Sequence, residues 1–150
     1  MSDLDRMLEL RTQRFYCSQI VMSMALDLQG RDDPALIRAM EGLAGGLGFT
    51  GEVCGTLTAG AAALGLYAGR GRASDDEDPN LLFMVEDLVR WFTDGYGEAY
   101  GGIRCREILG DAPSNQATRC PAMIAGTFQK VKDLLVENGF DLAGDPDRDD

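Results

Sequence analysis

Apolar residues recur every three or four positions along most of this chain, which is the spacing of amphipathic α-helices. Between about residues 4 and 28 they follow one helical face, at Phe15, Ile20, Val21, Met24, Ala25 and Leu28. Gly30 comes next, in a position suited to a helix stop. Asp33 and Pro34 then predict a second helix, with Asp33 as the N-cap and Pro34 as the first helical residue.

Four further segments show helical periodicity. They run from Thr50 or Gly51 through Cys54 to about Tyr67, from about Asn80 to Thr93, from Ile103 to Leu109, and from Cys120 to about Asn138. No useful length of sequence alternates with a period of two, and no internal repeat is visible. The sequence therefore predicts an all-α protein, a compact bundle of about five to six helices in a single domain.

A chain of 150 residues, of which 45% are hydrophobic, fits one domain with a sizeable core. We expect residues 1–140 to form a four-cysteine helical domain and the acidic residues 141–150 to form a disordered tail. The N-terminal segment is charged and does not resemble a secretory signal, and the longest apolar run, residues 57–68, is too short to span a bilayer. We therefore expect a soluble, cytoplasmic protein without membrane insertion.

The net charge is −11, from 25 acidic and 14 basic residues, which argues against nucleic acid or an anionic membrane surface as a partner. The chain has no histidine. This excludes Ser-His-Asp and Cys-His catalysis within the chain, and any zinc site with a histidine ligand. Four cysteines remain, and in a reducing compartment they more often indicate metal or redox chemistry than structural disulfides.

Three of the four cysteines are predicted at helix N-termini. Cys54 and Cys105 fall in the first turns of their helices, and Cys120 precedes Pro121 as the N-cap of the last helix. Free amides and the helix dipole favour a thiolate at such positions, so a lowered thiol pKa is expected there. Cys17 lies on the apolar face of the first segment, which by itself indicates a small buried hydrophobic residue.

The intervals between the cysteines are long, with no CxxC pair and no zinc-ribbon or ferredoxin spacing. Spacing alone is therefore weak support for a metal site. The absence of other chemistry, together with three helix starts that can converge, strengthens it. The alternatives are a pair of disulfides or four unpaired thiols in an intracellular core.

Small residues dominate the segment that follows Cys54. They are Gly55, Ala59, Gly60, Ala61, Ala62, Ala63 and Gly65. Each interior glycine weakens a helix by about 1 kcal/mol, so we expect these residues to permit the close approach of another helix. Such a face suits a core contact or a homodimer equally well.

Four cysteine-bearing motifs follow one another along the chain: "RFYCSQIVMSMAL", "GEVCGTLTAGAAALGL", "YGGIRCREILG" and "RCPAMIAGTFQKV". In this order the chain resembles the C-GCAxxG-C-C family, small four-cysteine proteins that are ascribed redox activity and marked by a CGAxxG motif. The resemblance covers roughly residues 13–136. Where the motif reads CGAxxG, this chain has Cys54-Gly55-Thr56-Leu57-Thr58-Ala59, with its next glycine at Gly60, and all four cysteines are in place.

The resemblance implies a redox role with Cys17, Cys54, Cys105 and Cys120 as the site, holding a metal or an iron–sulfur cluster. Our first hypothesis is that these cysteines converge to bind an iron–sulfur cluster for electron transfer or redox sensing, because four thiolates satisfy a [2Fe–2S] or [4Fe–4S] cluster. A second is metal-free thiol–disulfide chemistry, with Cys105 and Cys120 as the pair. A third is an interaction module stabilised by a Cys₄ zinc site. A redox role also implies a redox partner protein.

Overall fold

A computed structural model describes residues 1–148, and in this range the chain is helical, with an isolated β-bridge between Val53 and Arg104. The elements are α1 (Asp3–Thr12), α2 (Cys17–Leu28), α3 (Pro34–Met40), the 3₁₀-helix η1 (Glu41–Leu43), α4 (Ala44–Leu47), α5 (Gly55–Ala68), α6 (Asn80–Phe92), the π-helix η2 (Thr93–Gly97), α7 (Glu98–Tyr100), α8 (Cys105–Leu109) and α9 (Asn115–Glu137). The predicted all-α single domain is confirmed. Within residues 1–148, no helix combines the length and apolar character that crossing a membrane requires.

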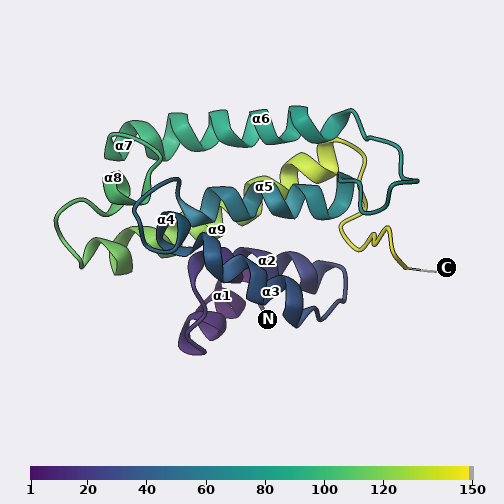
Figure 1. Cartoon of the computed structure of the whole chain (residues 1–150). Coiled ribbons are helices and arrows are strands. Elements are labelled where there is room, and N and C mark those ends of the chain that lie inside the picture. The colour runs from purple at the N-terminus through teal and green to yellow at the C-terminus, as the bar shows by residue number, and fades with distance from the viewer. Residues whose placement is uncertain (149–150) are drawn as a thin grey trace.

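Helix α5 lies in the middle of the bundle, between α6 on one side and α2 on the other (Figure 1). The long helix α9 also packs against α5. The small residues of α5 allow this packing, since Ala59, Gly60 and Ala63 are buried in the core. A Cβ atom at Gly60 would stand 3.0 Å from Thr127 Cγ2 and 3.1 Å from Leu88 Cδ2, so α6 and α9 approach the α5 backbone closely there.

Helix α2 packs against α5, and every residue of α2 from Ser18 to Leu26 is buried. Two of its buried polar side chains, Ser18 and Gln19, are hydrogen-bonded to backbone carbonyls. Ser18 Oγ donates to the Met40 carbonyl at 2.7 Å, and Gln19 Nε2 donates to the Ile37 carbonyl at 3.3 Å. These two bonds join α2 to α3, whose start is the one predicted: Pro34 is the first residue, and Asp33 accepts from the Leu36 amide at 3.1 Å.

The apolar segment between residues 4 and 28 forms two helices with a sharp turn between them. Helix α1 ends at Thr12, and Arg14 adopts a left-handed conformation with φ 69°. The Phe15 amide donates back to the Leu10 carbonyl at 3.2 Å, which closes the turn. Turns of this kind usually carry Gly or Asn at the left-handed position, so an arginine gave no signal of the break. As a result Cys17 is the first residue of α2.

The prediction that Cys120 caps the last helix is wrong. Helix α9 begins at Asn115, and both Cys120 and Pro121 lie inside it. A proline near the start of a helix removes an amide donor but does not prevent the helix from continuing past it, so Pro121 was a misleading boundary. The start of α9 is fixed instead by α8, because Asn115 Nδ2 donates to the Leu109 carbonyl at 2.7 Å.

The acidic C-terminal segment lies against the bundle as far as the structure describes it. Tyr67 Oη donates to the Leu142 carbonyl at 2.6 Å, and Gln29 Nε2 donates to the Gly144 carbonyl at 2.7 Å. Arg31 Nε lies 3.6 Å from Asp145 Oδ2. Of the ten residues expected to form a disordered tail, 149 and 150 lie outside the described residues.

The close packing at Gly60 generates a stability prediction. Gly60→Val is expected to lower the free energy of unfolding by about 1–3 kcal/mol, because the added methyl groups overlap Thr127 and Leu88. Gly65 is the matched control in the same helix, since nothing lies within 4 Å of a Cβ added there. Gly65→Ala is expected to raise the free energy of unfolding by about 0.5–1 kcal/mol through helix propensity. Urea denaturation measures both, and a neutral Gly60→Val would contradict the close approach.

Candidate functional site: a cavity lined by four cysteines

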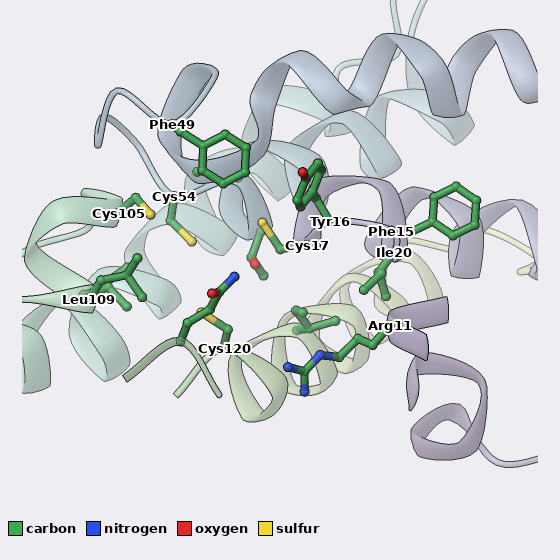
Figure 2. A pocket seen from close by; sticks show the side chains of 16 residues that line it. Arg11, Phe15, Tyr16, Cys17, Ile20, Phe49, Cys54, Cys105, Leu109 and Cys120 are labelled. Atoms are coloured by element: carbon green, nitrogen blue, oxygen red, sulfur yellow. The ribbon is translucent and has the colours of Figure 1, made fainter. Parts of the chain in front are cut away.

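Cys17, Cys54, Cys105 and Cys120 line one cavity of about 170 Å³, referred to below as the cysteine cavity (Figure 2). Four separate elements supply them. Cys17 begins α2, Cys54 is the N-cap of α5, Cys105 begins α8, and Cys120 lies near the start of α9. All four are free thiols. The fold thus brings together the four residues that the sequence indicated.

The remainder of the cavity wall is mainly apolar. The apolar and aromatic residues are Phe15, Tyr16, Ile20, Phe49, Ile108, Leu109 and Ile124. Arg11 is the charged side chain in the wall, and no carboxylate lines the cavity in the part of the chain that the structure describes. Such a wall excludes water and raises the cost of any charge inside that is not balanced locally.

Two aromatic rings cover the cavity on its solvent side. Tyr16 and Phe49 meet edge to face, with ring centroids 5.0 Å apart, and the two residues are 39% and 61% exposed (Figure 2). Phe49 lies in the loop between α4 and α5. It has a left-handed backbone with φ 65°, as does Leu47, the last residue of α4, with φ 61°. Left-handed conformations are unfavourable for large side chains, so the tertiary structure holds this loop in place.

A short antiparallel backbone pairing places Cys54 beside Cys105. The Cys54 amide donates to the Ile103 carbonyl at 2.9 Å, and the Cys105 amide donates to the Glu52 carbonyl at 2.7 Å. These bonds flank the β-bridge between Val53 and Arg104. Each cysteine comes directly after its bridge residue, with Cys54 as the N-cap of α5 and Cys105 as the first residue of α8, so the pairing positions both residues.

Glu52 reinforces this pairing, a role that the sequence did not reveal. Its carboxylate pairs with the Arg106 guanidinium and lies 3.7 Å from Arg104 Nε. Arg106 also donates to the carbonyls of Gly51 and Thr50, at 3.1 and 3.3 Å. The sequence predicts a helix from Thr50 or Gly51 that would include Glu52, but α5 begins only at Gly55. The available signal was an acid beside Cys54 in "GEVC" and two arginines around Cys105 in "IRCRE".

Gly55 is needed for the close approach of the Cys17 sulfur. A Cβ atom at Gly55 would stand 3.1 Å from Cys17 Sγ and 2.7 Å from the Leu43 carbonyl oxygen. Both contacts are closer than a side chain at this position normally makes. The glycine directly after Cys54 therefore serves the packing of a different cysteine, supplied by α2.

Contacts between α8 and α9 place Cys120 in the cavity. Arg119 Nη1 donates to the Ile108 carbonyl at 2.6 Å, and its guanidinium carbon lies 4.4 Å from the centre of the Tyr100 ring. Together with the bond from Asn115 to Leu109, these contacts hold the first turns of α9 against α8. Cys120 is the residue after Arg119, so the same anchor sets its position.

The expectation of lowered thiol pKa values is wrong. Burial raises the pKa of the Cys54 thiol to about 11, and the nearby Cys17 adds to this rise. The amides of Thr56 and Leu57, at the start of α5, do lower this pKa, but burial outweighs them. Burial also raises the pKa of Cys105. For Cys120, burial and then the other three cysteines raise the pKa to about 12, although the positive charge of Arg11 opposes them.

The four cysteines share the cavity without converging on a single ion. Among residues 1–148, no group of three or more Cys, Asp or Glu side chains is placed to hold a metal ion. A structural zinc ion needs four ligands at once, with each sulfur about 2.3 Å from the metal. This spacing gives the Cys₄ zinc hypothesis no support.

Comparison with known proteins agrees with the cysteine pattern. The family described as "Putative redox-active protein (C_GCAxxG_C_C)" matches residues 15–134, a span that contains all four cysteines. No curated protein and no solved structure matches the chain. The resemblance indicated by the order of the four cysteine motifs is confirmed.

The raised pKa values generate a prediction for the reduced, metal-free protein. Because folding raises the pKa of Cys54 and Cys120 above the value of about 8.5 for a free cysteine, both thiols stay protonated as the pH rises through 9. The ultraviolet absorption of thiolate measures this directly. Between pH 7 and pH 10, Cys54→Ala and Cys120→Ala are expected to remove almost no thiolate signal from the folded protein.

Urea provides the control, because in the unfolded chain each of these two cysteines should ionise near its ordinary pKa. The raised pKa values also make the stability of the folded protein depend on pH. Unfolding above about pH 9 releases protons that the folded state retains, so the free energy of unfolding falls as the pH rises toward the folded pKa values. A folded-state ionisation of Cys54 or Cys120 below pH 9 would show that burial does not control these thiols.

Proposed function

The chain belongs to the C-GCAxxG-C-C family, and we propose from this membership that its cysteine cavity holds an iron–sulfur cluster and serves as a one-electron redox centre. The observation that carries the proposal is that Cys17, Cys54, Cys105 and Cys120 line a single cavity. Thiolates are soft ligands, and four of them satisfy a [2Fe–2S] or [4Fe–4S] cluster without any other ligand. The cluster, when bound, supplies a one-electron couple to a redox partner.

A cluster does not require the four sulfurs to surround one ion. A cluster distributes its four cysteines over several iron atoms, so its ligands stand farther apart than four sulfurs around one zinc. The four cysteines here share a cavity and yet form no single-ion site within the described residues. Each of them also comes from a different element: Cys17 from α2, Cys54 from the start of α5, Cys105 from α8 and Cys120 from α9.

The charges around the cavity suit an anionic group. Four thiolates concentrate negative charge. The Arg11 guanidinium in the cavity wall and the amides at the start of α5 stabilise that charge. Lining carboxylates, which would oppose that charge, are absent from the described part of the chain. The apolar side chains keep water away from the sulfurs, and this limits hydrolysis and oxidative loss of a bound group.

Protonation distinguishes this proposal from metal-free thiol chemistry. Only the thiolate binds metal or attacks a disulfide, and burial holds protons on Cys105 and Cys120 by raising their pKa values. A thiol–disulfide pair made of these two residues would therefore react slowly at neutral pH. Metal binding can overcome the same protonation, because coordination releases the protons of all the ligands together.

Anaerobic reconstitution tests the proposal. The reduced full-length protein, incubated with ferrous iron and sulfide and then desalted, is expected to retain both elements and to absorb visible light. Cys17→Ala, Cys54→Ala, Cys105→Ala and Cys120→Ala should each lose most of the bound iron, because each removes one ligand. Iron and sulfide analysis, normalised to protein that is helical by circular dichroism, gives the result.

Ile20→Val is the matched control, since it shortens a side chain of the cavity wall without removing a ligand. Folded wild-type protein that retains neither iron nor sulfide would refute the cluster. Zinc retained without colour would favour the interaction module. A two-proton mass difference after thiol blocking, localised to Cys105 and Cys120, would favour the thiol–disulfide reaction.

Gly55 offers a test that leaves all four sulfurs in the chain. Gly55→Ala adds a Cβ against Cys17 Sγ and the Leu43 carbonyl, so the Cys17 sulfur must move. We expect iron to be lost to a chelator about tenfold faster than from the wild type, as is usual when the support of a ligand is disturbed. Gly65→Ala, in the same helix and without contacts, should behave as the wild type. Equal loss rates in the two variants would place Cys17 outside the ligand set.

A further inference from the structure

A second hollow adjoins the cysteine cavity on the side of α1. This groove, of about 330 Å³, shares Arg11, Phe15, Tyr16 and Gln116 with the wall of the cavity. Arg14 lines the groove as well, and its remaining walls are apolar. Figure 2 shows the Arg11 side chain extending from α1 toward the side of the cavity where Cys120 lies. The groove is therefore an open hollow next to the cysteine cavity, and the guanidinium groups of Arg11 and Arg14 line it.

Both arginines of the groove are unpaired in the described part of the chain. Among residues 1–148, the guanidiniums of Arg11 and Arg14 make no ion pair and no side-chain hydrogen bond. The chain carries 25 acidic residues and 14 basic ones. None of the described residues that line the groove is acidic, so no lining carboxylate neutralises its two guanidinium groups.

The position of Arg14 adds an independent observation. Its φ of 69° lies in the left-handed region, at the turn that ends α1. Glycine adopts this conformation readily, whereas it strains a residue with a Cβ. The backbone turn alone would be better served by glycine, and in this chain it carries a guanidinium that lines the groove.

We propose that Arg11 and Arg14 form a binding site for the carboxylate or phosphate group of a small molecule at the mouth of the cysteine cavity. Guanidinium groups bind both oxyanions through paired, charge-assisted hydrogen bonds. The side chains of Gln116 and Tyr16, which also line the groove, add an amide and a hydroxyl. The groove shares part of its wall with the cysteine cavity, so a ligand held there by its oxyanion lies next to that cavity.

The charge of the protein favours a small molecule over an acidic macromolecule. With a net charge of −11, the chain repels an acidic protein or a nucleic acid as a whole. A small anion meets mainly the local field of the two guanidiniums, since salt screens charges more than about 10 Å away. The groove volume also lies in the range of small-molecule sites, roughly 300–1,000 Å³. The site does not depend on which cofactor the cysteines hold.

Titration of the reduced full-length protein with inorganic phosphate, and separately with acetate, tests this site. Nuclear magnetic resonance of the arginine side-chain N–H groups follows the binding, at constant ionic strength set with sodium chloride. At least one of the anions is expected to shift the Arg11 and Arg14 signals in a saturable way. Arg14→Gly and Arg11→Gln should each weaken that binding at least about tenfold, the effect of losing one charge-assisted contact.

Arg14→Gly also carries its own check on folding. It removes the left-handed cost at this turn, so its thermal stability without anions should equal or exceed that of the wild type. Arg90→Gln is the matched charge control, because Arg90 lies on α6 and pairs with Glu86 at 2.8 Å. It should bind as the wild type does.

Each outcome assigns or rejects the site. Saturable binding of phosphate but not acetate identifies a phosphate ligand, and the reverse identifies a carboxylate ligand. Absence of saturable shifts with both anions overturns the proposal. So does an Arg14→Gly or Arg11→Gln variant that binds like the wild type. If Arg90→Gln weakens binding as much as they do, the effect is one of net charge and the site is rejected.

Discussion

Two backbone hydrogen bonds, on either side of the bridge between Val53 and Arg104, hold the geometry of the site. They join parts of the chain that are distant in sequence, and each part leads directly into a helix that begins at or just after a cysteine. Without this pairing, α8 would be held chiefly by its contacts with α9 and α4, since it is a short helix between glycine-rich and polar loops. Because α9 is anchored on α8, the positions of Cys105 and Cys120 both depend on the same pairing.

Burial and helix electrostatics act in opposite directions on the sulfurs. At Cys54 the amides of Thr56 and Leu57 favour a thiolate, and removal from water favours the thiol more strongly. The helix start thus does not make a reactive nucleophile here. Its partial positive charge reduces the cost of a thiolate that something else must stabilise, and a metal centre is the group that does so most effectively.

Most of the fold could be predicted from periodicity and capping residues. Helix α6 and the start of α3 lie where the pattern placed them, because Asp33, Pro34 and the apolar stripe of α6 are local signals. The break at Arg14 could not be predicted, since a residue that disfavours the left-handed region occupies it. The start of α9 was missed because Pro121 is tolerated inside that helix.

For the site, the sequence identified the four cysteines and missed what arranges them. A pairing of three residues on each side is too short to show alternation, so the bridge at Val53 left no periodic trace. For the same reason the sequence predicts a helix from Thr50 or Gly51, where the structure has an extended segment before α5. The pKa values depend on burial by residues distant in sequence, and a prediction from helix ends alone gave the opposite sign.

The loop that carries Leu47 and Phe49 has a consequence for dynamics. The left-handed backbone of each of these residues costs about 1–2 kcal/mol. This strain is released when the loop detaches from the bundle by local unfolding. Helices α2 and α5 have no residue with a left-handed backbone, and most of their residues are buried in the core. The amides of residues 44–51 should therefore exchange with solvent through local opening, while those of α2 and α5 await global unfolding. Phe49, which lines the cysteine cavity, thus belongs to a segment that we expect to open at a lower free energy than α2 and α5.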